Sequence, residues 1–460
     1  MTQQYTYRDP TLSLWQSAVA QVQRNRNSVQ ARMSPAATAK FAVPGPLVDD
    51  DLMAPVHLLG PSLATGQTSP PAALSSPQVS PAAAPAALTG AAVVLDCAKV
   101  AAQFLWAEIT GNQQQSDLYA SELRFSQCDA LGWAECLTAY LAAKLSCGTL
   151  PYRPNLDVVK PLPPTAKIAI IGDWGTGDDV AINLLNQIAA LKPDILLHLG
   201  DVYYSGTHNE ANDNFLAVCR QILGSSIPLY TLCGNHDMYS GGDGYYWLID
   251  QIGQQSSYFS LQNDYWQILA MDTGHNDNNP LTVATNMTSL VNIPGWSEAN
   301  WHLGKIQQAG TRRIAVFSHH QLFSPFSSVG NVGNQQYAYN PNLFSNFQSA
   351  ISKIDIWFWG HEHTLALYDP YMGLVRGRCV GASAVPVFTD QQQYAADTNL
   401  QPYQGAQLPT WNPNAILAAN GTEYNNAFAI MTLNNATATI NYYQVPLLKP
   451  AIQLPFTDTI

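Results

Sequence analysis

The sequence predicts an α/β fold for residues 161–460, because short apolar runs alternate with an amphipathic helix and polar motifs follow the runs. Residues 167–172 and 195–200 are short apolar runs, and residues 178–191 between them show helical periodicity that ends before Pro193. Strand, helix and strand in this order form a βαβ unit, which places both strands parallel in one sheet.

The same pattern continues toward the C-terminus. Further strands are predicted at residues 227–233, 265–271, 312–318 and 354–359, with a helix at 297–309. Residues 423–445 predict a hairpin that turns at Asn434 and Asn435. The long loops 274–296 and 321–346 lie next to the polar motifs in sequence, which is typical of loops that form a substrate pocket.

Two different compositions precede the α/β region. Residues 1–92 are predicted to be an N-terminal extension, and residues 34–92 of it are rich in Pro, Ala and Ser, as in linkers. Residues 93–160 are predicted to be a small helical region, because apolar residues recur near helical spacing between 93 and 147. The α/β domain, with the C-terminal hairpin, is expected to span residues 161–460.

Composition and charge exclude several classes of protein. Only 11% of the 460 residues are charged, well below the typical ~25%, and the formal net charge is −12 without a Lys/Arg cluster, which argues against a nucleic-acid partner. No run of ~18 apolar residues occurs, so no membrane span is expected. The N-terminus lacks a basic stretch followed by an apolar core, so the expected location is cytoplasmic by default, with non-classical export left open.

Seven cysteines occur in the chain, an odd number without a CxxC pair. Four of them lie close together in the predicted helical region, and their spacing leaves one or two disulfides open: Cys97, Cys128, Cys136 and Cys147. Cys233 precedes a polar motif on an apolar strand and is expected to be a buried thiol.

Five short polar motifs stand at the ends of predicted strands. They are Gly172-Asp173-Trp174-Gly175, Gly200-Asp201-Val202-Tyr203-Tyr204, Gly234-Asn235-His236-Asp237, Val316-Phe317-Ser318-His319 and Gly360-His361-Glu362-His363. Together they offer seven metal-binding side chains: Asp173, Asp201, Tyr204, Asn235, His319, His361 and His363. One bridging carboxylate and six terminal ligands satisfy two metal ions that each keep an open position.

Each of these residues also has a structural interpretation. Asp173 and Asp201 are the type of residue that often forms turns after strands, and Tyr204 alone reads more readily as a packed aromatic. His320 is as good a candidate as its neighbour His319. Only the ordered set favours a metal centre. Glu362 is expected to be solvated and to point away from it, and residues 357–359 are expected in the core.

The motif set resembles the purple acid phosphatases, a branch of the calcineurin-like metallophosphoesterases, over roughly residues 165–445. The family pattern is Asp-x-Gly, Gly-Asp-x-x-Tyr, Gly-Asn-His-Glu/Asp, x-x-x-His and Gly-His-x-His. Gly175 replaces the metal-binding His of most metallophosphoesterases, while Tyr204 supplies an anionic oxygen. The resemblance implies a four-layer α/β/β/α sandwich of two mixed sheets flanked by helices.

The resemblance also implies two ligand shells that share Asp201 as the bridge. The first metal would take Asp173, Asp201, Tyr204 and His363, and the second would take Asp201, Asn235, His319 and His361. A hard phenolate favours Fe(III) in the first position. Two imidazoles, an amide oxygen and a carboxylate suit Fe(II), Zn(II) or Mn(II) in the second.

Two residues beside the ligands are assigned to the chemistry. His236 follows Asn235 and is expected to bind the phosphoryl group or to protonate the leaving alkoxide. Asp237 is expected to orient the His236 imidazole. The further pocket histidine of the family falls at Ser328 here, so the candidates to replace it are His320, His208 and His275.

These expectations combine into a dinuclear metal-dependent phosphohydrolase. The preferred activity is that of an acid phosphomonoesterase, which attacks a small phosphoester with a metal-bound hydroxide. A phosphodiesterase acting on cyclic nucleotides or phospholipid-like esters is the enzymatic alternative. A non-catalytic interaction scaffold is the alternative of another class; it predicts missing ligands, and the sequence lacks none.

Overall fold

The computed structural model describes residues 151–460, except 281–287, 333–334, 390–391, 421–422 and 447–448. It also describes seven earlier residues: Arg124, Asp129, Cys136, Ala139, Tyr140, Ala142 and Ala143. The expected extension 1–92 and most of the expected helical region lie outside this part. Of these seven earlier residues, the helical ones are Cys136, Ala139, Tyr140, Ala142 and Ala143.

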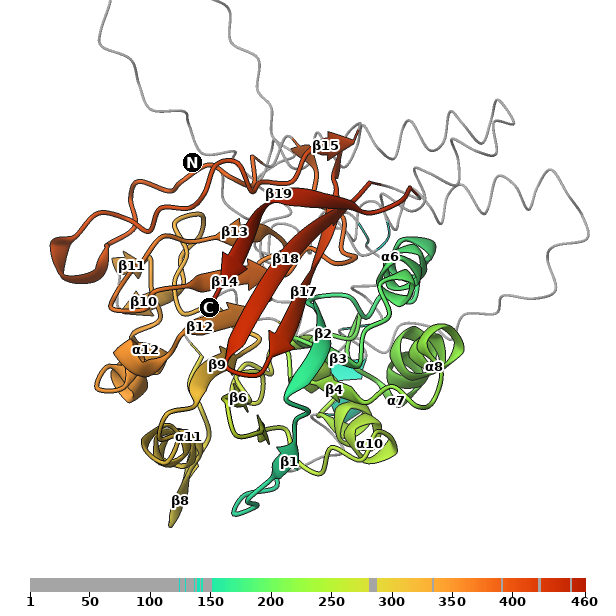
Figure 1. The fold of residues 1–460 in the computed structure, drawn as a ribbon, viewed down its shortest axis with the longest axis horizontal. Coiled ribbons are helices and arrows are strands. Elements are labelled where there is room, and N and C mark those ends of the chain that lie inside the picture. The colour runs from blue at the N-terminus through green and yellow to red at the C-terminus, as the bar shows by residue number, and fades with distance from the viewer. Residues whose placement is uncertain are drawn as a thin grey trace, which may run out of the picture.

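A six-stranded sheet in the described part has the order β19-β18-β17-β2-β3-β4 (Figure 1). Its strands are β2 (Thr165–Ile171), β3 (Ile195–His198), β4 (Leu229–Thr231), β17 (Asn426–Asn434), β18 (Thr437–Val445) and β19 (Ile452–Thr459). The pairs β2/β3 and β3/β4 are parallel, whereas β17 runs antiparallel to β2. The predicted βαβ unit and the predicted C-terminal hairpin are therefore both confirmed.

A seven-stranded sheet, again counted over the described residues, has the order β1-β5-β6-β9-β12-β14-β13. Its strands are β1 (Val159–Pro161), β5 (Phe259–Gln262), β6 (Trp266–Ala270), β9 (Arg313–Phe317), β12 (Ile356–Trp359), β13 (Leu365–Leu367) and β14 (Gly377–Val380). The strands β6, β9, β12 and β14 are mutually parallel, and β13 runs antiparallel to β14. Strand β1 pairs with β5, so this sheet begins before the domain boundary expected at residue 161.

The side chains of each strand alternate between two faces, and this alternation builds the layers. Ile168 and Ile170 of β2 lie in one core cluster with Phe317 and Phe358 of the other sheet, between the two sheets. The intervening Ala169 of β2 faces the opposite way, into a cluster with residues of α6 (Asp179–Ala190) and α8 (Ala217–Leu223).

Helices cover the outer face of each sheet. The helix α6 (Asp179–Ala190) buries Leu184, Leu185 and Ile188 against the six-stranded sheet, and Asp178 caps its first turn by accepting a hydrogen bond from the backbone N–H of Ala181. On the other side, α11 (Glu298–Gln307) and α12 (Pro341–Phe347) share a cluster with Trp357 and Trp359 of β12. The expected four-layer α/β/β/α sandwich is confirmed.

Short elements connect these layers. The helices are α7 (His208–Glu210), α8 (Ala217–Leu223), α9 (His236–Tyr239) and α10 (Asp243–Gln251), with a π-helix at Ala211–Leu216 and 3₁₀ turns at Ile351–Lys353 and Tyr403–Gly405. Three small hairpins pair β7 (Asn292–Ile293) with β8 (Trp296–Ser297), β10 (Gly330–Val332) with β11 (Gln335–Tyr337), and β15 (Ala419–Asn420) with β16 (Glu423–Tyr424). Among the described helices, none is long and apolar enough to cross a membrane.

A buried ion pair joins the edge of one sheet to the other. Arg378 on β14 donates two hydrogen bonds of 2.7 Å to the two carboxylate oxygens of Asp458 on β19. The Tyr442 hydroxyl donates a third, at 2.6 Å, to the same carboxylate. Such a planar two-bond pairing fixes the relative position of its two strands.

Candidate metal centre

The polar motifs meet where five parallel strands of two different sheets end. Asp173, Asp201 and Asn235 follow β2, β3 and β4 of the six-stranded sheet, and His319 and His361 follow β9 and β12 of the seven-stranded sheet. The carboxyl ends of strands are the usual place for ligands in α/β proteins. The site therefore lies at the seam between the two sheets.

His319 is at the centre of the first group of contacts. Its Nε2 atom lies 3.1 Å from Asn235 Oδ1, 3.2 Å from His361 Nδ1 and 3.5 Å from Asp201 Oδ2. Two sets of potential ligand atoms in the described residues come within 4.8 Å of one another: Asp173, Asp201 and His319, and also His319, His320 and His361.

Asp173 connects the two sheets on the other side of the site. Its Oδ2 atom accepts a hydrogen bond of 2.8 Å from the backbone N–H of His361, and its Oδ1 atom lies 3.4 Å from His363 Nε2. Asp173 is fully buried, and Asp201 is 1% exposed. Six of the seven predicted ligands are thus brought together: Asp173, Asp201, Asn235, His319, His361 and His363.

The position expected for Tyr204 requires a correction. Its hydroxyl donates a hydrogen bond to the carboxylate of Asp129, away from the other predicted ligands. The hydroxyl that lies among them belongs to Tyr203, at 3.2 Å from Asp173 Oδ1, 3.3 Å from Asp201 Oδ2 and 3.1 Å from His363 Nε2. Two tyrosines stand side by side in this loop, and in the structure it is the Tyr203 hydroxyl that lies among the other predicted ligands.

The atoms around His319 fit a cation. Its Nδ1 atom lies 2.9 Å from the carbonyl oxygen of Leu199, which can only accept, so the ring proton is on Nδ1 and Nε2 carries a lone pair. Burial lowers the pKa of His319 well below its ordinary value, although Asp173 opposes this, and the ring is therefore neutral.

Asn235 also turns an acceptor into the site. Its amide nitrogen donates to the Tyr239 hydroxyl at 2.6 Å, which directs the carbonyl Oδ1 toward His319 Nε2. Two acceptor atoms 3.1 Å apart repel each other unless a cation lies between them. Together with two buried carboxylates, this arrangement has the donor chemistry of a site for transition metals.

His236 lies beside this centre. Its Nδ1 atom is 2.6 Å from the carbonyl oxygen of Tyr204, so Nδ1 carries the proton, and its Nε2 atom is 4.0 Å from Asp201 Oδ2. The ring is held between the rings of Tyr203 and Tyr239, at centroid distances of 4.5 Å and 4.8 Å. The imidazole thus presents Nε2 toward the carboxylate of the centre.

Asp237 does not orient the His236 imidazole, contrary to the expectation. Its Oδ2 atom accepts from the backbone N–H groups of Asp201 at 3.0 Å and Gly234 at 2.8 Å, and its Oδ1 atom accepts from Val202 at 3.2 Å. Burial raises the pKa of Asp237 to about 7, while these backbone donors oppose the shift. Asp237 therefore holds together the two loops that carry Asp201 and Asn235.

The candidate pocket histidines occupy different places. His320 is fully buried, with Nε2 3.0 Å from Asp277 Oδ2 and Nδ1 3.1 Å from Thr273 Oγ1, and its ring lies 4.3 Å from that of His361. The ring of His208 lies against Trp247, and that of His275 against Tyr152. Of the three, His320 is the one that reaches the centre.

Glu362 is buried, whereas the sequence predicted a solvated side chain. Its carboxyl oxygens accept hydrogen bonds from Ser324 at 2.6 Å, Ser327 at 3.4 Å and Tyr368 at 3.2 Å. Only 4% of the residue is exposed, and burial raises its pKa to about 7. The side chain ties the His361–His363 turn to the loop after β9 and to Tyr368, which directly follows β13.

Four cysteines of the described residues are buried and free: Cys136, Cys219, Cys233 and Cys379. The buried thiol expected at Cys233 is therefore confirmed.

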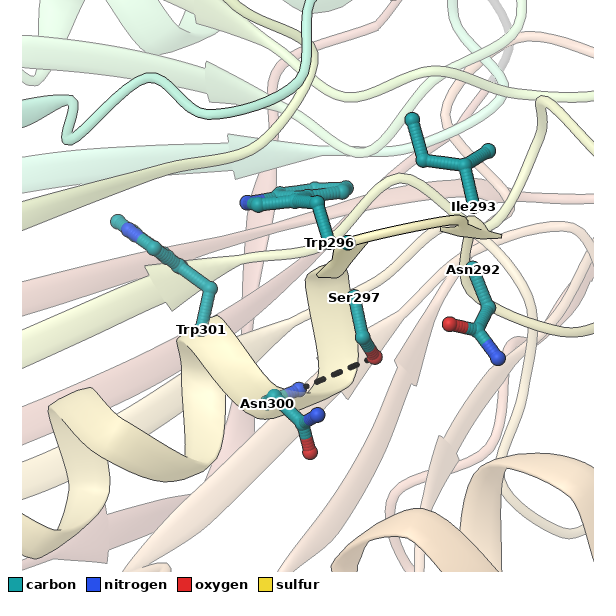
Figure 2. Close-up of a pocket in the computed structure, with 7 residues that line it drawn as sticks. Asn292, Ile293, Trp296, Ser297, Asn300 and Trp301 are labelled. Atoms are coloured by element: carbon teal, nitrogen blue, oxygen red, sulfur yellow. Dashed lines mark hydrogen bonds between the residues drawn. The ribbon is translucent and has the colours of Figure 1, made fainter.

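A separate pocket of about 570 Å³ lies at the start of α11 and contains none of the site residues (Figure 2). It is lined by Asn292, Ile293, Gly295, Trp296, Ser297, Asn300 and Trp301.

Comparison with solved structures finds related folds at low identity. A purple acid phosphatase from yellow lupin (Lupinus luteus) seeds is 16% identical, with a TM-score of 0.42, over 68% of this chain and 55% of that one. A dimetal phosphatase from Danio rerio is 12% identical, with a TM-score of 0.38, over 64% and 99% of the two chains. The GAP50 anchor of the Plasmodium inner membrane complex is 13% identical, with a TM-score of 0.39, over 64% and 88%.

The chain thus spans only about half the length of the lupin protein, and each of these TM-scores is too low to support a functional argument. Among curated proteins, none matches the chain. In another comparison, residues 166–365 match the model of the calcineurin-like phosphoesterases. The matched range, which is less than half of the chain, contains every residue of the candidate centre and both groups of described side chains that could hold a metal ion.

Proposed function

We propose that this protein is a dinuclear metal-dependent phosphomonoesterase of the purple acid phosphatase type, acting on a small phosphoester. The observation that carries the proposal is the set of opposed acceptor atoms around His319 Nε2, beside two buried carboxylates. A site that holds acceptors against each other in a buried position is built for cations. The second motif contains a tyrosine, and the first motif has Gly175 where most metallophosphoesterases have a metal-binding His. This combination favours the purple acid phosphatase branch.

The contacts divide the ligands into two shells. Tyr203, Asp173 and His363 gather on one side, where the phenol oxygen lies 3.2 Å and 3.1 Å from the other two side chains. Asn235, His319 and His361 gather on the other side. Asp201 Oδ2 lies 3.3 Å from the Tyr203 hydroxyl and 3.5 Å from His319 Nε2, which supports Asp201 as the residue that would be shared between the two shells.

The backbone at Gly175 supports a phenol in place of a histidine. A Cβ atom at this position would lie 2.7 Å from both the carbonyl oxygen of Asp201 and the Cα atom of Val202. No side chain fits there without moving the loop that carries Asp201. The phenol of Tyr203 fills the ligand role that the first motif leaves open.

The donor sets indicate which metals each shell takes. A phenolate with a carboxylate is a hard, anionic set that favours Fe(III), and the shell with two imidazoles suits Fe(II), Zn(II) or Mn(II). Bound by these residues, two such ions would supply Lewis acidity for the phosphoryl oxygens and would lower the pKa of bound water. To protonate the leaving alkoxide, His236 would act as the imidazolium: its Nδ1–H is donated to the Tyr204 carbonyl oxygen, and a second proton on Nε2 would be transferred to the leaving oxygen.

The test combines metal analysis with hydrolysis assays. The purified, unchelated protein should contain about two metals per chain and hydrolyse 4-nitrophenyl phosphate faster than bis(4-nitrophenyl) phosphate. His361→Ala should lose metal and activity together. The matched control is His208→Ala, because the His208 ring lies against Trp247 outside the centre.

Three outcomes would contradict the proposal or part of it. Protein with much less than one metal that still hydrolyses a phosphoester would refute the metal mechanism. Metal-loaded protein inactive on both substrates would favour a non-catalytic scaffold. Faster hydrolysis of the diester would retain the mechanism and change the substrate class to phosphodiesters.

A further inference from the structure

The side chain of Tyr204 connects the region before residue 151 to the candidate centre. Its hydroxyl donates to the carboxylate of Asp129, which stands 75 residues earlier in the chain. Its carbonyl oxygen accepts the Nδ1–H hydrogen bond of His236 at 2.6 Å. Tyr204 therefore contacts both the carboxylate of Asp129 and the imidazole of His236, which is assigned to protonate the leaving group.

A second contact joins the same two regions. Cys136 forms one buried cluster with Tyr203, Tyr204, Tyr239 and Val385, and it is 1% exposed. Tyr203 and Tyr239 are the two rings that hold the His236 imidazole between them. The N-terminal region thus contacts the surroundings of His236 by packing as well as by a hydrogen bond.

Three of the described residues of this region share one buried helical face. Cys136, Tyr140 and Ala143 are 1%, 8% and 9% exposed, whereas Ala142 is exposed. Spacings of four and three residues place the first three on one side of a helix. Of this face, Cys136 packs against the tyrosines beside the candidate centre.

The loop of Tyr204 is fixed from the other side by Glu210. The Glu210 carboxylate accepts hydrogen bonds from the backbone N–H groups of Tyr204, Ser205 and Thr207, the last at 2.8 Å. The backbone of the loop is therefore held by α7, and the Tyr204 side chain by Asp129. The carbonyl oxygen that orients His236 lies between these two anchors.

We propose that Asp129 is a positioning residue for catalysis, which acts through Tyr204 to hold His236 with Nε2 facing the centre. The inference rests on the function proposed above, because it assigns a purpose to the His236 orientation in that reaction. It also gives the N-terminal region a role in completing the catalytic site. A displacement of a catalytic group by about 1 Å can lower a rate by about 10²-fold, so a remote anchor can matter.

The experiment uses the full chain and compares Asp129→Ala with Tyr204→Phe. Both variants should keep the metal content of the wild type. Both should lose up to about 10²-fold in kcat on an alkyl phosphate, and much less on 4-nitrophenyl phosphate, because nitrophenolate leaves without a proton. Asp129→Asn, which keeps an acceptor oxygen, should restore part of the rate and guards against misfolding of the alanine variant.

Two matched controls remove similar groups elsewhere. Tyr443→Phe deletes a hydroxyl that bonds Gln453, and Asp369→Asn alters a carboxylate that accepts from Thr410. Neither should change the ratio of the two rates. The double variant Asp129→Ala/Tyr204→Phe should be no slower than the slower single variant, since both act through one contact.

The decisive comparison places Tyr204→Phe in a His236→Ala background. If Tyr204 acts by positioning His236, the additional change should leave the residual rate unaltered. A further loss there, a loss of metal in either single variant, or equal slowing on both substrates would overturn the inference while leaving the proposed function intact. A wild type without phosphoesterase activity would overturn both.

Discussion

The two adjacent tyrosines of the second motif give the sharpest test of the centre. Tyr203→Phe removes a hydroxyl that lies 3.1 Å from His363 Nε2, 3.2 Å from Asp173 Oδ1 and 3.3 Å from Asp201 Oδ2. Tyr204→Phe removes a hydroxyl that bonds Asp129 instead. The two variants are equal in size and differ only in which oxygen is lost, so each is the control for the other.

The magnitude follows from the position of the Tyr203 oxygen. Loss of a group that only orients a metal ligand typically lowers metal affinity or activity by about 10–100-fold. The Tyr203 hydroxyl is in contact with three ligand side chains, so its removal should cost at least that factor in affinity for the metal on its side. Tyr204→Phe should leave metal affinity unchanged and lower turnover alone.

Metal titration and a visible spectrum distinguish the two. Iron-loaded wild type should be coloured by charge transfer from the phenolate to Fe(III), and Tyr203→Phe should bleach this band while Tyr204→Phe retains it. If Tyr204→Phe bleaches the protein and Tyr203→Phe does not, the loop is arranged as the motif spacing predicted. A colourless iron-loaded wild type would remove the phenolate from either shell.

Three further predictions concern other parts of the molecule. His236→Ala should keep both metals and slow alkyl phosphate hydrolysis by about 10²–10⁴-fold, with a smaller loss on 4-nitrophenyl phosphate; equal losses would assign His236 to phosphate binding. Asp458→Asn should destabilise the fold by about 3–5 kcal/mol in urea unfolding, whereas Asp250→Asn at an exposed pair with Arg153 should cost less than about 1 kcal/mol. Burial raises the pKa of Asp458, but the Arg378 hydrogen bonds outweigh it and lower the pKa overall. The stabilisation by this pair is therefore present above the unfolded value of about 3.9 and lost as pH falls through the folded value. Removal of metal by a chelator should lower the free energy of unfolding by about 2.7 kcal/mol relative to protein with free metal at 100 times its Kd. An unchanged unfolding curve would contradict a bound metal.

Most of the strands could be predicted because the residues that define each strand are consecutive in the sequence. The runs at 195–197 and 356–359 are apolar without interruption, as expected of strands buried on both faces, and both form strands. The ligand positions follow from the same pattern, since a polar motif directly after a buried strand has to emerge at the end of the sheet. This reasoning requires only the order of residues within each motif.

What the sequence did not reveal depends on contacts between distant residues. Tyr203 and Tyr204 are the same residue type side by side, and in the structure the Tyr204 hydroxyl is hydrogen-bonded to Asp129, which is 75 residues away. Glu362 is buried because Ser324 and Tyr368 supply hydroxyl donors to its carboxyl group, and neither pairing has a sequence signature. Strand β1 was missed because it is three residues long and pairs with β5 about a hundred residues later.

The candidate ligands come from two different sheets. The sequence motifs therefore identify the residues, but they do not predict how the residues are arranged relative to one another. Asp201 leaves a strand of one sheet and His319 leaves a strand of the other, yet their side chains approach to 3.5 Å. The hydrogen bond from the His361 backbone to Asp173 crosses the same seam. The separation of the two groups of candidate ligands is therefore set by how the sheets pack on each other, through the core between them and the Arg378–Asp458 pair. A change in that packing, far from any candidate ligand, should alter both groups together, because Asp201 contacts both of them.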